Sequence, residues 1–176
     1  MNNISNQRGA TLIIALVILV LMTMLSITGM QTTILEEKMA GNMADNNAAL
    51  QSAEAALREA EVQFTPLQFA PIPISSCGAP PCQLWELGQA GNLTLKDNAW
   101  WSANGHEFGD IGVQEFTRAS EDPRYIAEHF SDVKDDYASG LDAGSGKTMY
   151  RLTARGKGSS DNAEVILQSS YSKRYN

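Results

Sequence analysis

A long uncharged segment near the start of the chain constrains the fold more than any other feature. Residues 10–30, ATLIIALVILVLMTMLSITGM, contain no charged residue and no proline. A helix of this length spans about 30 Å, which is the thickness of the hydrocarbon core of a bilayer. A secretory signal has a shorter apolar stretch and ends at an A-x-A-like site, and no such site follows here. The segment is therefore predicted to span a membrane as a helix.

The following residues extend the same helix. Residues 31–63 are rich in Ala, Leu, Glu, Met and Gln, which favour helices, and no proline occurs before Pro66. One helix of about 80 Å is predicted over Ala10–Gln63, with Gly29 and Gly41 as its weakest points. Its second half carries an amphipathic stripe, which we expect to pack on the chain's own globular part. The stripe consists of Ala44, Ala48, Ala49, Ala53, Ala56, Leu57 and Ala60.

The charge of the chain limits its partners and its topology. The 176 residues carry a formal net charge of −7, so the surface would repel nucleic-acid phosphates and no nucleic-acid partner is expected. Arg8 is the only charged residue before the apolar segment, and positive residues favour the cytoplasmic side of a membrane. The N-terminus is therefore predicted to be cytoplasmic, and the rest of the chain to be exported.

The two cysteines, Cys77 and Cys82, lie in a proline-rich segment, residues 64–82, that is predicted to be a loop. Their C-x4-C spacing differs from the C-x-x-C of redox motifs, so a structural disulfide is favoured in an oxidising compartment. The only histidines, His106 and His129, show no metal-ligand spacing. We expect no metal, no other cofactor and no enzymatic activity, because no catalytic set of residues emerges.

Three alternating segments predict an antiparallel sheet packed on the helix, which is an α+β fold. They are residues 124–130, 148–158 and 163–172, and a Gly/Ser/Asp/Asn turn joins the last two. In these last two strands, one face is predicted to carry Tyr150, Leu152 and Ala154, and Val165, Leu167 and Ser169, respectively.

Three further motifs have competing interpretations. Of Trp100 and Trp101, one is expected in the core and the other partly exposed, in preference to a partner-binding hot spot. Residues 131–136, SDVKDD, favour a solvated acidic loop over a calcium site. Residues 144–148, GSGKT, favour a flexible loop before a strand, because Leu141 stands where a phosphate-binding loop requires glycine.

The junction QRGATLIIAL resembles a prepilin signal, in which a short positive leader ends in glycine and the mature chain begins Phe-Thr-Leu-Ile-Glu. Gly9 matches the residue before the cut. The second to fourth mature residues are matched by Thr11, Leu12 and Ile13. The resemblance implies that prepilin peptidase removes residues 1–9 and that Ala10 becomes an N-methylated terminus.

Two positions depart from that pattern. Ala10 replaces the usual aromatic residue, and Ile14 stands where most pilins carry a glutamate. In that family the carboxylate is thought to pair with the amine of a neighbouring subunit, because a charge in lipid must find a partner. The absence of this carboxylate implies a place where no subunit lies ahead, such as the filament tip.

Two longer stretches resemble the PilX family of minor pilins. Residues 34–61 are similar to its first periplasmic helix, and residues 150–173 to its closing hairpin. The resemblance implies four parts, a leader, a transmembrane and polymerisation helix, a periplasmic amphipathic helix and an α+β head. These are residues 1–9, 10–30, 31–63 and 64–176. Small or polar residues allow close helix packing, and the residues expected to carry anchoring and assembly are Ala10, Ile14, Leu19, Thr23 and Gly29.

The implied function is structural. Such a minor pilin lies in the bacterial inner membrane with a periplasmic C-terminal domain and then enters the pilus. Its implied partners are other minor pilins, the major pilin and a tip adhesin, with which it primes assembly and supports twitching motility and adhesion. Alternatives are a type II secretion pseudopilin, an uncleaved single-pass membrane sensor or binding protein, and a calcium-binding tip module.

Overall fold

The protein is described by a computed structural model that covers residues 10–78, 81–110, 116–134 and 146–175. The chain divides into two compact units, residues 1–43 and residues 44–176. We call them the N-terminal unit and the C-terminal unit. The elements are α1 (Ala10–Phe64), β1 (Trp85–Glu86), the 3-10 helix η1 (Leu93–Leu95), α2 (Asn98–Asn104), β2 (His106–Glu107), β3 (Arg124–Lys134), β4 (Gly146–Lys157) and β5 (Glu164–Arg174).

Helix α1 begins at the predicted residue and ends one residue beyond the predicted end. It is continuous through Gly29 and Gly41, the two residues of lowest helix propensity. A side chain at either position would meet open space. In the N-terminal unit, its apolar side chains are exposed from Leu12 to Met43. This surface contrasts with the second half of the helix, whose apolar residues are partly buried.

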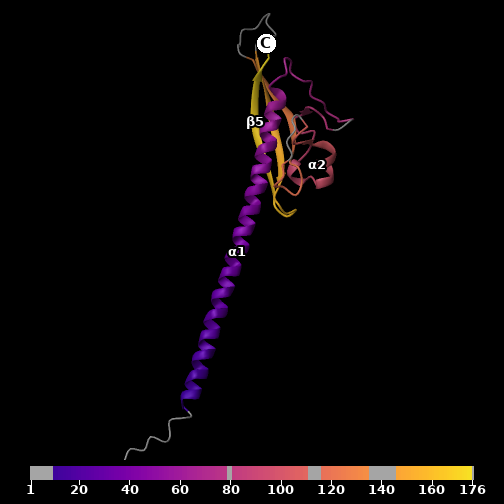
Figure 1. The fold of residues 1–176 in the computed structure, drawn as a ribbon. Helices are drawn as coiled ribbons and strands as arrows, with labels where there is room; N and C mark the ends of the chain where they lie inside the picture. Colours follow the sequence, from indigo (N-terminus) through magenta and orange to yellow (C-terminus); the bar gives the residue numbers. More distant parts are fainter. Residues whose placement is uncertain (1–9, 79–80, 111–115, 135–145, 176) are drawn as a thin grey trace, which may run out of the picture. The chain divides into compact units, whose positions relative to one another are not determined.

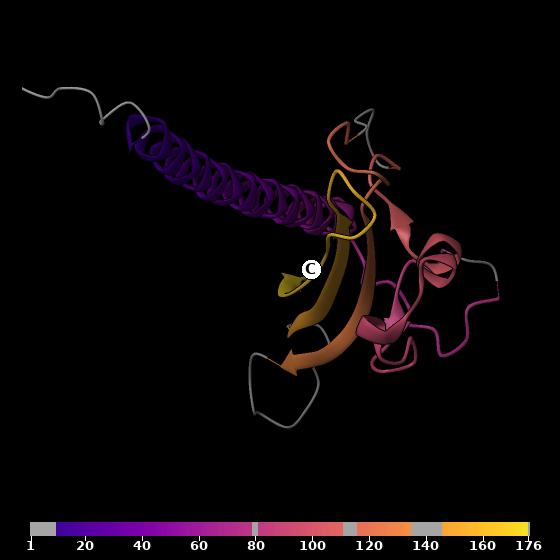
Figure 2. The same cartoon turned by 90° about the horizontal axis from the view of Figure 1, so that it is seen from below.

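The C-terminal unit is built on one sheet with the order β1-β3-β4-β5, and β2 also pairs with β3. Strands β3, β4 and β5 are antiparallel neighbours, whereas β1 runs parallel to β3. The predicted antiparallel sheet and the α+β class are confirmed, and the bounds of the three long strands differ from the predicted ones by no more than four residues. In both views β3 lies between α2 and the part of α1 that belongs to the C-terminal unit (Figures 1 and 2).

Helix α1 packs on one face of this sheet through the predicted stripe. Ala49, Ala53, Ala56 and Ala60 are fully buried, whereas Ala44 at the start of the stripe is exposed. The main core contains Ala56, Ala60, Phe64, Leu84, Tyr125, Ala127, Tyr150, Leu152 and Ala154. The face predicted for β4 is thus confirmed, and the corresponding residues of β5 are only half-buried.

Two glycines of β4 and its turn allow the helix to approach closely. A Cβ atom on Gly156 would lie 2.5 Å from the carbonyl oxygen of Ala49 and even nearer to the Ala53 nitrogen. A Cβ on Gly158 would lie 2.6 Å from the carbonyl oxygen of Asp45. Real Cβ atoms do not come so close, so glycine is required where the strand meets a helix face of alanine.

The last strand also caps the helix. The Lys173 ammonium of β5 donates hydrogen bonds to the carbonyl oxygens of Phe64, Thr65 and Leu67 at 2.6–2.7 Å. Phe64 is the last helical residue, so its carbonyl is one of those that a helix leaves without an internal partner, and Thr65 and Leu67 belong to the segment that follows. A cation at this end also interacts favourably with the helix dipole. The end of α1 is therefore fixed by a side chain more than a hundred residues later in the sequence.

The turn between β4 and β5 is held to α1 by Asp45. Its carboxylate accepts hydrogen bonds from the backbone nitrogen of Ser160, at 3.0 Å, and from the Ser160 hydroxyl. These bonds hold the pKa of Asp45 below its usual value. A lowered pKa gives stability that is complete above the unfolded-state pKa, near 3.9, and is lost as the pH falls through the folded value.

We therefore expect the Ser160 amide proton resonance to titrate as the pH falls from about 5 to about 2, as the carboxylate is protonated. The measurement is a proton–nitrogen NMR titration of the full chain in detergent micelles. The Asp45→Asn variant is the control and should show no such titration at Ser160. A flat Ser160 resonance in the unsubstituted chain over this range contradicts the contact.

The opposite face of the sheet is covered by α2 and the segments around it. Trp101 is fully buried there with Trp85, Leu93 and Ile126, and Trp100 is partly buried at its side. The prediction for the adjacent tryptophans is therefore confirmed. Their segment forms the short helix α2, in which neighbouring residues point to different sides.

Two loop predictions need correction at their boundaries. Residues 131–134 belong to β3 rather than to an acidic loop, because they continue the ladder with β4 after a bulge between His129 and Ser131. Residues 146–148 belong to β4 rather than to a flexible loop. The rest of both motifs lies outside the described residues.

Candidate functional site

The N-terminal part of α1 is long and apolar enough to cross a membrane. One face of this part of the helix consists of Ala15, Ile18, Leu19, Met22, Thr23, Ser26 and Ile27. These positions are three and four residues apart, so they form a single stripe along the helix. The stripe contains a small residue and two short hydroxyl side chains, which are the types that allow two membrane helices to pack closely.

The hydroxyl groups in this segment are satisfied within the helix. Thr23 donates to the carbonyl oxygen of Val20 at 2.8 Å, Ser26 to Met22 at 2.9 Å, and Thr28 to Met24 at 2.8 Å. Such bonds to the preceding turn lower the cost of placing a hydroxyl in lipid. They leave the oxygen able to accept a bond from a neighbouring helix.

The predicted assembly residues all lie on α1. Ile14 and Leu19 are exposed, and so are Ala10 and Gly29. Leu19 and Thr23 belong to the stripe just described, whereas Ile14 does not line it. Ile14 therefore presents an uncharged side chain at the position where the prepilin pattern has glutamate. Gly9 lies outside the described residues.

Cys77 and Cys82 form a disulfide, with their Cα atoms 5.9 Å apart. The bridge lies beside the second core, because Cys82 is buried with Trp85 and Cys77 packs partly against the same cluster. His106 of β2 contacts the carbonyl oxygen of Cys82 at 3.2 Å and stacks on the ring of Tyr125. Burial lowers the pKa of His106, so this ring is neutral at pH 7. These contacts attach the disulfide loop to the edge of β3.

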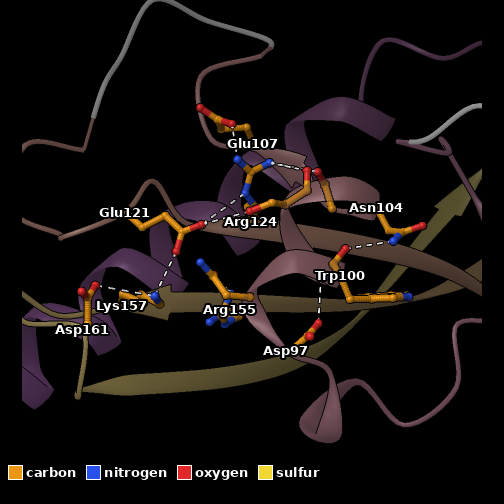
Figure 3. Close-up of polar contacts among 12 residues, drawn as sticks. Asp97, Trp100, Asn104, Glu107, Glu121, Arg124, Arg155, Lys157 and Asp161 are labelled. Carbon is orange, nitrogen blue, oxygen red and sulfur yellow. Dashed lines mark hydrogen bonds and ion pairs between the residues drawn. The ribbon is translucent and has the colours of Figure 1, made fainter.

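The outer face of the sheet, opposite α1, carries a network of ion pairs (Figure 3). Arg124 of β3 binds Glu107 of β2 at 2.5 Å and lies 3.9 Å from Glu121. Glu121 also binds Lys157 of β4 at 3.1 Å, and Lys157 lies 3.7 Å from Asp161 in the turn. The network therefore ties two strands to the segments that cover them.

Arg155 of β4 lies beside this network (Figure 3) and makes separate contacts with α2 and β5. Its guanidinium donates to Asn98 of α2 and to Glu164 of β5, both at 2.7 Å, and the residue is 5% exposed. Asp97 caps α2 by accepting a hydrogen bond from the backbone nitrogen of Trp100 at 2.9 Å. The buried guanidinium of Arg155 thus holds the first residue of α2, Asn98, against the sheet.

A second charged pair lies deeper. Glu128 of β3 is fully buried, and its carboxylate accepts hydrogen bonds from Arg151 of β4, at 2.7 and 2.8 Å, and from the backbone nitrogen of Gly88 at 2.9 Å. Gly88 has a φ of 79°, a conformation that glycine adopts without strain. The buried carboxylate therefore fixes both the neighbouring strand and the turn after β1.

A polar pocket of about 330 Å³ opens beside this pair. Glu128 and Arg151 line it together with Thr153, Gln168 and Ile166 of β4 and β5, and residues 91–94 cover its other side. The Gln168 amide nitrogen donates to the Thr153 hydroxyl at 3.1 Å, so the amide oxygen of Gln168 remains as an acceptor.

The chain was compared with family models, with curated proteins and with solved structures. The model described as PilX N-terminal matches residues 8–58, and the model described as type IV pilus assembly protein PilX C-term matches residues 41–173. The chain belongs to the PilX family of type IV pilus assembly proteins. No curated protein and no solved structure gave a significant match.

Membership of the PilX family defines the broad function. The protein is a minor pilin, a structural subunit that works in type IV pilus assembly together with other pilins. The long apolar helix fits the membrane anchor of such a subunit.

The sequence did not identify the buried charges of this PilX-family chain. Glu128 and Arg151 alternate with apolar residues along their strands, a pattern that normally places charges in solvent. They are buried or half-buried because residues 82–110 cover the outer face, and no periodicity in those residues predicts that cover. Their opposite charges face each other across β3 and β4, but the sequence predicted only residues 148–158 and 163–172 to be joined by a turn, so it did not predict this pairing.

Proposed function

We propose that this PilX-family protein belongs to the priming or tip complex that initiates the pilus, and so supports twitching motility and adhesion. Its proposed partners are other minor pilins, the major pilin and a tip adhesin. The observation that carries the proposal is Ile14. A subunit within the shaft would need a carboxylate there to pair with its neighbour's terminal amine, whereas a subunit with nothing ahead of it would not.

The proposed location follows from the anchor and its flanking charge. Before assembly, residues 10–30 would span the inner membrane, with the N-terminus in the cytoplasm beside Arg8 and the C-terminal unit in the periplasm. An oxidising periplasm is compatible with the Cys77–Cys82 disulfide. On assembly, the exposed stripe of α1 would exchange its contacts with lipid for contacts with the helices of other pilins, and both surroundings are apolar.

Processing at Gly9 is the step on which this function depends. We expect Gly9→Val to block the cut by prepilin peptidase, because a branched side chain replaces the glycine before the scissile bond. The protein would keep residues 1–9, and cells with this variant as their only copy would carry as few surface pili as a deletion strain. The measurements are the intact mass and N-terminal sequence of the membrane protein and a count of sheared pili.

Asn3→Ala, a leader substitution away from the cut, is the matched control and should give a mature chain beginning at methylated Ala10. Unsubstituted protein from cells without the peptidase should keep its leader. If residues 1–9 persist in unsubstituted protein from normal cells, the prepilin interpretation is wrong and an uncleaved single-pass sensor becomes the better explanation.

A further inference from the structure

One edge of the sheet is long, regular and open. Strand β5 pairs with β4 along its whole length, from Glu164 to Arg174, without a bulge. None of the strands in the described ranges pairs with its other edge. Exposed edges are usually protected by proline, a bulge, a short length or a covering element. Strand β5 contains no proline and no bulge, and its charged residues, Glu164, Lys173 and Arg174, lie at its two ends, so the outer backbone groups between them form a template for another strand.

The two faces of β5 show which side chains an added strand would need. On the face toward α1, the apolar side chains of Val165, Leu167 and Tyr171 are only half-buried. On the outer face, Gln168 and Ser170 are exposed. An added strand with apolar residues toward α1 and polar residues outward would complete the burial of the first set.

The polar pocket lies on the outer face beside this edge, since Ile166 and Gln168 of β5 form part of its wall. Its two charged groups, Glu128 and Arg151, are bound to each other. An anionic ligand group would gain little binding energy from a guanidinium that is already paired with Glu128. A cationic ligand group would be repelled by the same guanidinium. The Gln168 carbonyl oxygen and the partly exposed Arg151 guanidinium offer one acceptor and one donor, which suit a neutral amide or hydroxyl side chain.

We infer that the open edge of β5 binds an extended segment of another pilus subunit as an added strand, with a long neutral polar side chain of that segment in the pocket. The inference rests on the proposed function, which supplies the class of partner. The backbone ladder provides affinity, and the pocket and the half-buried apolar residues provide selectivity.

A second copy of this chain fits the edge poorly. In a symmetric antiparallel pair centred on Ser169, the serines at 170 and 172 of the copy would lie beside Gln168 and Ile166 at the pocket. A serine side chain is too short to fill a space of about 330 Å³. Val165 would face Lys173 of the copy, whose ammonium is held by carbonyls of its own chain. The segment that binds is therefore expected to have a different sequence.

The experiment places a photoreactive benzoylphenylalanine at Ser172, which is exposed on the outer face of β5. A matched probe replaces Ile72, which is 85% exposed in the proline-rich loop. Cells with assembled pili are irradiated, and crosslinked peptides from sheared pili are mapped by mass spectrometry. We expect the Ser172 probe to crosslink to an alternating apolar and polar segment of another pilus subunit, and the Ile72 probe not to reach that segment.

Two consecutive proline variants, Ser169→Pro and Ser170→Pro, test the backbone ladder. Successive N–H groups of a strand point to opposite edges, so one proline removes a bond to β4 and the other removes an N–H from the open edge. The variant that keeps its melting temperature identifies the open-edge position, and it should lower the crosslink yield from Ser172 about tenfold. Gln168→Ala should also lower the yield, whereas Thr153→Val, which removes the same internal hydrogen bond but keeps the amide, should not.

Four results would overturn the inference. They are a crosslink from Ser172 to a second copy, a crosslink to a helix of another subunit, no crosslink although the protein is present in sheared pili, and an undiminished yield in the open-edge proline variant. Each leaves the proposed function intact. Absence of the unsubstituted protein from sheared pili would instead remove the proposed function, and the inference with it.

Discussion

Replacing Gly156 by alanine is expected to destabilise the C-terminal unit by about 3 kcal/mol, at the upper end of the cost of overpacking a core. The added Cβ would lie 2.5 Å from the Ala49 carbonyl oxygen and nearer still to other atoms of α1. Two of its three nearest atoms are helix backbone, which cannot rotate away as a long side chain can. The helix and β4 would have to separate, and the Ser52 hydroxyl would lose its 3.0 Å hydrogen bond to the Lys157 carbonyl oxygen.

The measurement is thermal unfolding of the full chain in detergent micelles, followed by the near-ultraviolet circular dichroism of the tryptophans. A loss of about 3 kcal/mol corresponds to a fall of about 10 °C in melting temperature for a unit of this size. Gly78→Ala is the matched control, because a Cβ there meets nothing within 4 Å. Equal melting temperatures for the two variants would show that α1 does not approach β4 this closely.

The parts of the fold that periodicity controls could be predicted from the sequence. Alanines three and four residues apart marked the buried face of α1, and alternation at Tyr150, Leu152 and Ala154 marked the buried face of β4. The close contact between the two could not be predicted. Gly156 lies in an ordinary strand pattern, and its need for glycine arises only when Ala49 comes near it in three dimensions.

In the candidate site, too, local features could be predicted from the sequence, and features that depend on distant contacts could not. The anchor and the absence of a charge at Ile14 are local features and were visible in the sequence. Glu128 was not predicted as a buried residue, because its burial depends on irregular segments that carry no periodic signal. The open edge of β5 was also hidden, since strand order depends on pairings between distant segments.

Arg151→Leu is expected to destabilise the C-terminal unit by about 3 kcal/mol, because it leaves the fully buried Glu128 carboxylate without its cation. This value is at the lower end for a broken buried pair, since the Arg151 side chain is 28% exposed and water can reach the site. Among the residues that the structure describes, the Gly88 N–H, at 2.9 Å, would still bind the carboxylate. Glu128→Gln should cost less, about 1 kcal/mol, because the amide oxygen can still accept from Gly88 and Arg151 can reach solvent.

The double variant Glu128→Gln/Arg151→Leu separates an ion-pair effect from lost packing. If the stranded charge is the main cost, removing it should recover about 1–2 kcal/mol, so that the double variant is more stable than Arg151→Leu alone. Urea unfolding of the full chain in micelles measures all three variants under the same conditions. Additive losses in the double variant would mean that Arg151 stabilises the sheet through its aliphatic stem and not through Glu128. A recovery would show that the cost of Arg151→Leu arises from the buried Glu128 carboxylate left without its cation, so that each charge is tolerated at this position only because the other is present.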